Sequence, residues 1–148
     1  MSRKLLLEQE LRKAIQNDQL SLVYQSKVEL STGKMVGVES LLRWHHPNLG
    51  FISPGEFIPI AEETGQIISI GNWVLREACK QIKYWRDMGY TELNVAVNVS
   101  VLQFKSTSFI ENLKNALEEL EIPPNALELE ITESIMQNIE ETLEILKH

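Results

Sequence analysis

The hydrophobic and polar positions of this chain follow two patterns, one typical of helices and one typical of strands. Apolar residues recur at helical spacing between Leu5 and Asn17, and again with a period close to 3.6 between Gln66 and Met88. They alternate with polar residues in the segments SLVYQSKVEL and MVGVESLLRW, which only the turn STGK separates. Two strands joined by so short a turn must be antiparallel. The pattern therefore predicts a helix, a β-hairpin and a long amphipathic helix.

Strands and helices continue to alternate along the rest of the chain. A short helical segment framed by Pro54 and Gly65 precedes the long helix. The later elements are a strand over 93–100, a helix opened by the capping-box spacing SFIE over 108–120, a strand over 126–132 and a last helix from Asn138. This order favours βαβ units and a mainly parallel sheet. Because the chain stops in helical register at ILKH, without Gly or Pro, we expect it to be a piece of a longer protein.

Three of the predicted strands carry polar side chains on one face. In MVGVESLLRW, alternation separates Glu39 and Arg43 from the apolar face that ends at Trp44. Asn98 and Glu130 hold similar positions on the strands over 93–100 and 126–132. Ligands bind at the carboxyl ends of the strands in α/β sheets and barrels, so Glu39, Asn98 and Glu130 should meet there if these strands are neighbours. Two carboxylates and an amide oxygen suit Mg²⁺, Mn²⁺ or Ca²⁺ rather than zinc.

The alternation has a second interpretation, which the pattern alone leaves open. It also describes an antiparallel sheet with one face in water. Glu128 lies lower on its strand and is expected to be solvated or paired with a cationic side chain. His45 and His46 are expected to lie in a loop or behind the metal ligands, because a tandem pair cannot easily bind one ion from a single strand face.

Composition and charge narrow the class of protein. The 148 residues are 43% hydrophobic and 24% charged, which is typical of one soluble globular domain. The net charge of −7 and the lack of a polybasic run argue against nucleic acid or an anionic membrane as the main partner. No apolar run approaches the ~20 residues that a membrane span needs. The single cysteine, Cys79, excludes an internal disulfide and fits a reducing, cytoplasmic location.

Several motifs together resemble the N-terminal part of the EAL domain, the bacterial cyclic di-GMP phosphodiesterase family. YQSKV is similar to the family's Y-Q-P-K-V strand, and VESLLRW is similar to the E-A-L-x-R-W stretch that names the family. HPNLGFISPGEFIPIAEETGQIISIGNWVL follows the family pattern over nearly its full length. NVS and LELEITES recur in the same order, so the resemblance covers roughly residues 11–148.

The resemblance implies an α/β fold, a TIM-like (β/α)8 barrel whose first strand is antiparallel. About four of the eight strands would be present, and residues 1–148 would form the N-terminal part of one EAL domain. It also implies two divalent cations, Mg²⁺ or Mn²⁺, held by Glu39, Asn98 and Glu130. Catalysis, the hydrolysis of cyclic di-GMP to linear pGpG, would depend on Glu39 and on Arg43, which would hold a substrate phosphate. The other implied site residues are Gln25, Pro54, Phe57 and Pro59 in contact with the dinucleotide and Glu133 as the anchor of a neighbouring loop.

The chain departs from the family pattern in three ways. Ser26 replaces a proline, Ser40 replaces an alanine, and the later motif D-D-F-G-x-G-x-S, a catalytic lysine, a glutamate and a glutamine are not in this sequence. We therefore expect no meaningful turnover by this chain alone. Half a barrel leaves open sheet edges, so a homo-oligomer or a domain-swapped assembly is expected.

The function of the full-length protein has three alternatives at this stage. It is an active phosphodiesterase, a degenerate EAL domain that binds cyclic di-GMP as a signalling module, or a domain that only mediates dimerisation. A GGDEF or sensor domain is a possible neighbour in the full-length protein.

Overall fold

A mixed sheet of five strands organises the computed structural model, which describes residues 2–131. The strand order is β1-β2-β4-β5, and β3 pairs with β2 outside this path. The elements, in chain order, are α1 (Arg3–Leu11), β1 (Leu20–Val28), β2 (Met35–His46), β3 (Gly50–Ile52), α2 (Pro54–Thr64), α3 (Ile67–Asp87), β4 (Val95–Val99), α4 (Val101–Lys105), α5 (Phe109–Glu119), the 3₁₀ turn η1 (Pro124–Ala126) and β5 (Leu127–Ile131).

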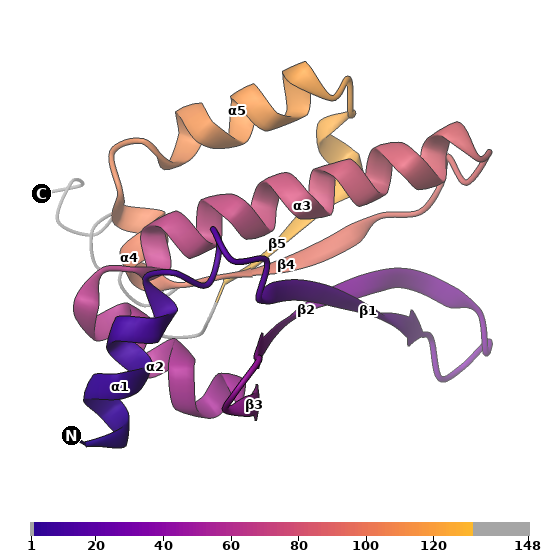
Figure 1. Ribbon diagram of the computed structural model, residues 1–148. Coiled ribbons are helices and arrows are strands. Elements are labelled where there is room, and N and C mark those ends of the chain that lie inside the picture. Colours follow the sequence, from indigo (N-terminus) through magenta and orange to yellow (C-terminus); the bar gives the residue numbers. More distant parts are fainter. Residues whose placement is uncertain (1, 132–148) are drawn as a thin grey trace, which may run out of the picture.

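The strand directions agree with the prediction from the sequence. β1 and β2 form an antiparallel hairpin, whereas β2, β4 and β5 are parallel to one another. Figure 1 shows the long helix α3 lying along the sheet, with α5 beside it. The α/β class and the antiparallel first strand are therefore confirmed. The last predicted helix, from Asn138, lies outside the described residues.

The core lies between α3 and the apolar face of the sheet. Val95, Val97 and Val99 of β4 are at most 1% exposed and share the face that alternation assigned to the helices. Each such side chain contributes roughly 1.5–3 kcal/mol when fully buried. Cys79 of α3 is buried as well, and this burial raises the pKa of its thiol to about 11. The thiol therefore stays protonated at neutral pH, as expected of a small apolar residue in a core.

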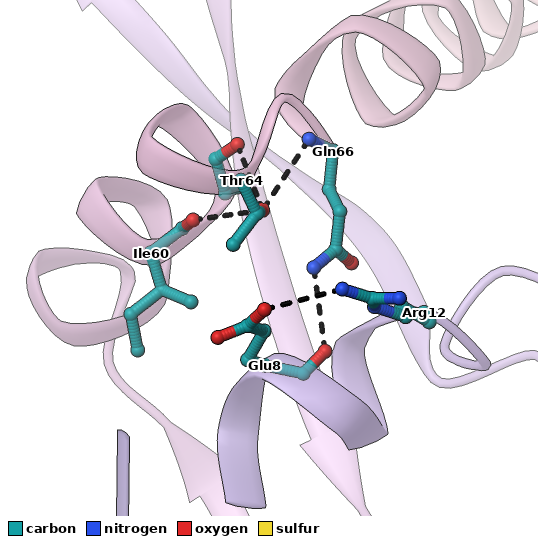
Figure 2. A network of polar contacts seen from close by, with 6 residues as sticks. Glu8, Arg12, Ile60, Thr64 and Gln66 are labelled. Atoms are coloured by element: carbon teal, nitrogen blue, oxygen red, sulfur yellow. Dashed lines mark hydrogen bonds and ion pairs between the residues drawn. The ribbon is translucent and has the colours of Figure 1, made fainter. Parts of the chain in front are cut away.

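The N-terminal helix is tied to the α2–α3 junction by polar contacts (Figure 2). Gln66 donates through Nε2 to the backbone oxygen of Glu8 at 3.3 Å, and Arg12 pairs with the Glu8 carboxylate at 3.1 Å. Thr64 closes the end of α2 by donating to the backbone oxygen of Ile60 at 2.9 Å. α1 ends at Leu11 rather than at the predicted Asn17, and residues 12–18 form turns that lead into β1.

β2 runs two residues past the predicted strand and folds back into the short strand β3, which the sequence analysis did not predict. His45 and His46 pair with Phe51 and Gly50, so the interpretation of the two histidines as loop residues is wrong. His46 Nδ1 accepts the backbone N–H groups of residues 48 and 49, both at 3.1 Å. Nε2 must then carry the proton, and it lies 3.2 Å from a carboxylate oxygen of Glu10. His46 therefore stabilises a turn.

The helix after β4 also differs from the prediction. α5 begins at Phe109 as expected, but the Ser108 side chain makes no capping bond and instead lies 3.0 Å from the Ser106 hydroxyl. The capping-box interpretation is therefore wrong. The extra helix α4 begins immediately after β4, and Ser100 caps it by accepting the backbone N–H of Gln103 at 3.3 Å.

Gly71 of α3 allows α4 to approach closely. A Cβ atom at this position would overlap the side-chain amide of Gln103, which is itself 2% exposed. We expect Gly71→Ala to lower the free energy of unfolding by about 1–3 kcal/mol through overpacking, as urea denaturation would show. The loss should be smaller in a Gln103→Ala background, where the clashing amide is absent. Equal losses in both backgrounds would contradict this packing.

Candidate functional site

The three side chains that the sequence analysis placed together are neighbours on the face of the sheet opposite the helix-packed core. Asn98 of β4 lies beside Glu130 of β5 in the strand register. The Asn98 Nδ2 atom lies 3.4 Å from the Glu39 Oε1 atom on β2, a long hydrogen bond that orients the amide. Glu39 and Glu130 are half-buried, and Asn98 is exposed. The parallel β2-β4-β5 order brings these three positions together, since each strand contributes one of them.

Lys27, which is not among the site residues predicted from the sequence, lies beside Glu130 of this group. Lys27 of β1 donates through Nζ to Glu130 Oε1 at 2.5 Å, and both side chains are about one-third exposed (32% and 31%). This hydrogen bond raises the pKa of Lys27, and the charges of Glu130, Glu128 and Glu39 raise it further. Alternation could have found this residue, because Lys27 shares its face with Gln25, whose register partner is Glu39.

Arg43 is the second charged residue of the MVGVESLLRW strand. It lies on the same face as Glu39, four residues further toward the carboxyl end of β2. The side chain is half-buried, and it donates to the backbone oxygen of Leu42 at 3.0 Å. Among residues 2–131, no carboxylate forms an ion pair with it. Its guanidinium group therefore retains donors for an anion.

A cavity of about 280 Å³ lies beside Arg43, between the carboxyl ends of β2 and β4 and the helices α2, α3 and α4. Its wall is mainly apolar, and Pro54 and Asn98 contribute to it. Gln103 also lines the cavity, and its Nε2 atom has no hydrogen-bond partner in the part of the chain that the structure describes. No pattern in the sequence identifies Gln103, because a lone glutamine on a short helix has no distinctive spacing.

The remaining implied contact residues are more scattered. Gln25 is exposed on β1, opposite Glu39. Pro54 lines the cavity, whereas Pro59 is exposed inside α2 and is not part of its wall. Phe57 is 0% exposed and packs edge-on against Trp44 at a ring-centroid distance of 5.5 Å. The Phe57 ring thus packs in the core beside Trp44, and its implied contact with the dinucleotide stays a prediction.

The family comparison identifies the chain. The sequence model described as the EAL domain matches residues 8–148. The chain belongs to the EAL domain family. The resemblance seen in the sequence is thereby confirmed.

EAL proteins from several bacteria are similar to this chain. The bifunctional diguanylate cyclase/cyclic di-GMP phosphodiesterase MucR of Pseudomonas aeruginosa is 47% identical over 145 residues, which is 97% of this chain and 21% of MucR. The oxygen sensor protein DosP of Escherichia coli is 42% identical over 144 residues, 97% of this chain and 18% of DosP. The chain therefore spans about a fifth of the length of the curated EAL relatives it matches.

Solved EAL structures have the same fold. The P. aeruginosa MucR phosphodiesterase in complex with c-di-GMP is 46% identical, with a TM-score of 0.87 over 96% of this chain and 58% of that one. The Xanthomonas citri FimX EAL domain in complex with c-diGMP is 25% identical, with a TM-score of 0.79 over 92% of this chain and 52% of that one. The interpretation of the fold as part of an EAL barrel is thereby confirmed.

Glu133, the implied loop anchor, lies outside the described residues. Within residues 2–131, no group of three His, Cys, Asp or Glu side chains is arranged to hold a metal ion. None of the described helices combines the length and the apolar character that crossing a membrane requires.

Proposed function

We propose that this chain supplies the first part of the active site of a metal-dependent phosphodiesterase, which hydrolyses one phosphodiester bond of cyclic di-GMP to give linear pGpG. The observation that carries the proposal is the meeting of Glu39, Asn98 and Glu130 on one face, with Arg43 at its rim. The relatives MucR and NbdA, both from P. aeruginosa, are named as cyclic di-GMP phosphodiesterases, and the MucR structure is described as a c-di-GMP complex.

The residues of the site fit a divalent cation. Glu39 and Glu130 offer carboxylate oxygens, and the contact of Asn98 Nδ2 with Glu39 leaves the carbonyl Oδ1 atom as the ligating oxygen of the amide. Such an oxygen set suits Mg²⁺ or Mn²⁺, and we propose two such cations in a complete EAL domain. A bound pair supplies a water of lowered pKa and stabilises charge on the phosphate.

The chain's own residues then bind and orient the dinucleotide. Arg43 is proposed to donate two parallel hydrogen bonds to a phosphate, because the guanidinium fork matches phosphate oxygens and no carboxylate pairs with it among the described residues. Gln25 beside Glu39 and Pro54 in the cavity wall are proposed to contact the substrate. Glu133 is proposed to anchor the neighbouring loop.

The deciding experiment measures cyclic di-GMP hydrolysis by the full-length protein in Mg²⁺ or Mn²⁺, with separation of cyclic di-GMP from pGpG by chromatography. The proposal requires conversion that EDTA stops and that returns when the cation is restored. A well-folded protein that binds cyclic di-GMP in calorimetry without hydrolysing it would instead be a signalling module, and one that does neither would be a dimerisation domain.

Ser40, which replaces the family's alanine, does not favour the signalling module. Its hydroxyl is buried and donates to the backbone oxygen of Ala96 at 3.0 Å, on the helix-facing side of the sheet. We expect Ser40→Ala to leave turnover within about twofold of the wild type and to lower the free energy of unfolding by about 1 kcal/mol. Steady-state kinetics and urea denaturation check the two parts, and a large loss of turnover would show that Ser40 acts in the site.

Self-association of the 148-residue chain is a further expectation of the proposal. β1 and β5 are the outer strands of the order β1-β2-β4-β5, and an outer strand presents unpaired backbone groups that can pair with another copy. We expect light scattering to give the mass of a dimer or of a larger, domain-swapped assembly. A stable monomer at all concentrations would contradict the expected self-association.

A GGDEF or sensor domain in the full-length protein is also proposed, since MucR is named as bifunctional and DosP as an oxygen sensor.

A further inference from the structure

The Lys27–Glu130 ion pair joins the two outermost strands of the path β1-β2-β4-β5. Neighbouring strands lie about 4.8 Å apart, so three spacings separate these backbones by about 14 Å along the sheet. A contact of 2.5 Å over that span requires both side chains to extend across β2 and β4. The pair is therefore a long-range contact of the fold.

Glu39, Glu128 and Glu130 lie around Ala96 of β4 in the strand register. In the strand register, Ala96 lies between Glu39 on β2 and Glu128 on β5, two residues before Asn98. Its methyl group leaves space on this face for a long side chain. Ala96 is 1% exposed, so neighbouring side chains close over it. The Lys27 ammonium group is thus near three carboxylates, those of Glu39, Glu128 and Glu130.

An ammonium ion and a divalent cation make incompatible demands on Glu130. Lysine carries its full positive charge at neutral pH, and it is a donor with no lone pair to offer a metal. The carboxylate oxygen that accepts from Lys27 is one of the oxygens proposed to bind a cation. A cation bound there would also be repelled by the ammonium charge only a few ångströms away.

We propose that Lys27 is an internal counter-ion, which stabilises the acidic group when no cation is bound and competes with the cation for Glu130. This inference rests on the proposed metal site of the EAL domain. Lys27 acts through Glu130, so it is a positioning residue, and it sets the cation concentration at which the site fills. When no cation is bound, three neighbouring carboxylates repel one another and destabilise the fold. A counter-ion within the acidic group reduces this repulsion.

Two measurements on the full-length protein test the competition. The counter-ion role predicts that removing the lysine lowers the stability of the cation-free protein but raises its affinity for Mn²⁺. In EDTA, Lys27→Met should unfold at a lower urea concentration than the wild type, because three carboxylates lose their counter-ion. In calorimetric titration with MnCl₂, the same variant should bind Mn²⁺ about fivefold more tightly, the factor that corresponds to one partly exposed ion pair. A lysine with a purely structural role would lower stability and weaken Mn²⁺ binding together.

Two further variants complete the design. Lys27→Arg keeps the charge, so its stability in EDTA and its affinity for Mn²⁺ should be close to those of the wild type. Lys34→Met removes an exposed lysine from the turn of the same hairpin and should change neither quantity. If the wild type binds Mn²⁺ and Lys27→Met binds it equally well or more weakly, the proposed competition is wrong, whereas the proposed metal site stands. No Mn²⁺ binding by the wild type or by any variant overturns the proposed metal site, and the competition with it.

Discussion

Replacing Glu39 with glutamine should reduce cyclic di-GMP turnover by the full-length protein about a thousandfold. The substitution keeps the size of the side chain but removes the negative charge that is proposed to hold the cation, and losses of this order follow when charge stabilisation at a reacting phosphate is removed. Glutamine can still contact Asn98 Nδ2, which lies 3.4 Å from the Glu39 carboxylate, so the fold should be retained. Initial rates at saturating Mn²⁺ measure the effect.

The controls for Glu39→Gln separate a lost ligand from a lost fold. Glu128→Gln removes an exposed carboxylate from the same face of the sheet and should keep at least half of the activity. In the 148-residue chain, Glu39→Gln should change the free energy of unfolding by no more than about 0.5 kcal/mol. Full-length activity that survives Glu39→Gln would refute the role of Glu39 as a metal ligand.

Replacing Arg43 with alanine should lower kcat/KM for cyclic di-GMP about a hundredfold. Arg43 lines the cavity, and among the described residues no carboxylate pairs with its guanidinium group, so its donors are available to a phosphate. Removing one preorganised charged donor from a reacting centre typically costs this much or more. Steady-state kinetics over a range of substrate concentrations gives kcat and KM separately.

A conservative variant tests the geometry of the Arg43 contact. Arg43→Lys keeps the charge but loses the planar fork, so it should recover only part of the loss. Arg12→Ala removes an exposed arginine that pairs with Glu8 on α1, and it should leave kcat/KM unchanged. Full activity in Arg43→Ala would show that the phosphate binds elsewhere.

The sequence predicted those parts of the structure that depend on periodicity. Strict alternation in MVGVESLLRW identified which side of β2 faces α3, because each side chain of a strand points opposite to its neighbour. The order of strands and helices likewise predicted that β4 and β5 run parallel to β2. The meeting of Glu39, Asn98 and Glu130 followed from these two facts, since it requires only the face and the neighbouring strands.

The sequence could not predict the parts that depend on particular tertiary contacts. β3 exists because Gly50, at φ +75°, permits a tight turn that His46 closes with two backbone hydrogen bonds. Lys27 reaches Glu130 across two intervening strands, a contact that no local pattern encodes. The spacing SFIE satisfied the capping rule, but the Ser108 hydroxyl contacts Ser106 instead, since a nearer partner competes for it.

The close approach of Gly71 to Gln103 has a consequence for the divergence of homologous domains. A methyl group at position 71 would overlap the Gln103 amide, so that amide must move before a side chain fits there. A lineage that acquires alanine or serine at position 71 is therefore expected to shorten the side chain at position 103 or to shift α4, which begins just after β4. The two positions, 32 residues apart in the sequence, are expected to change together during evolution.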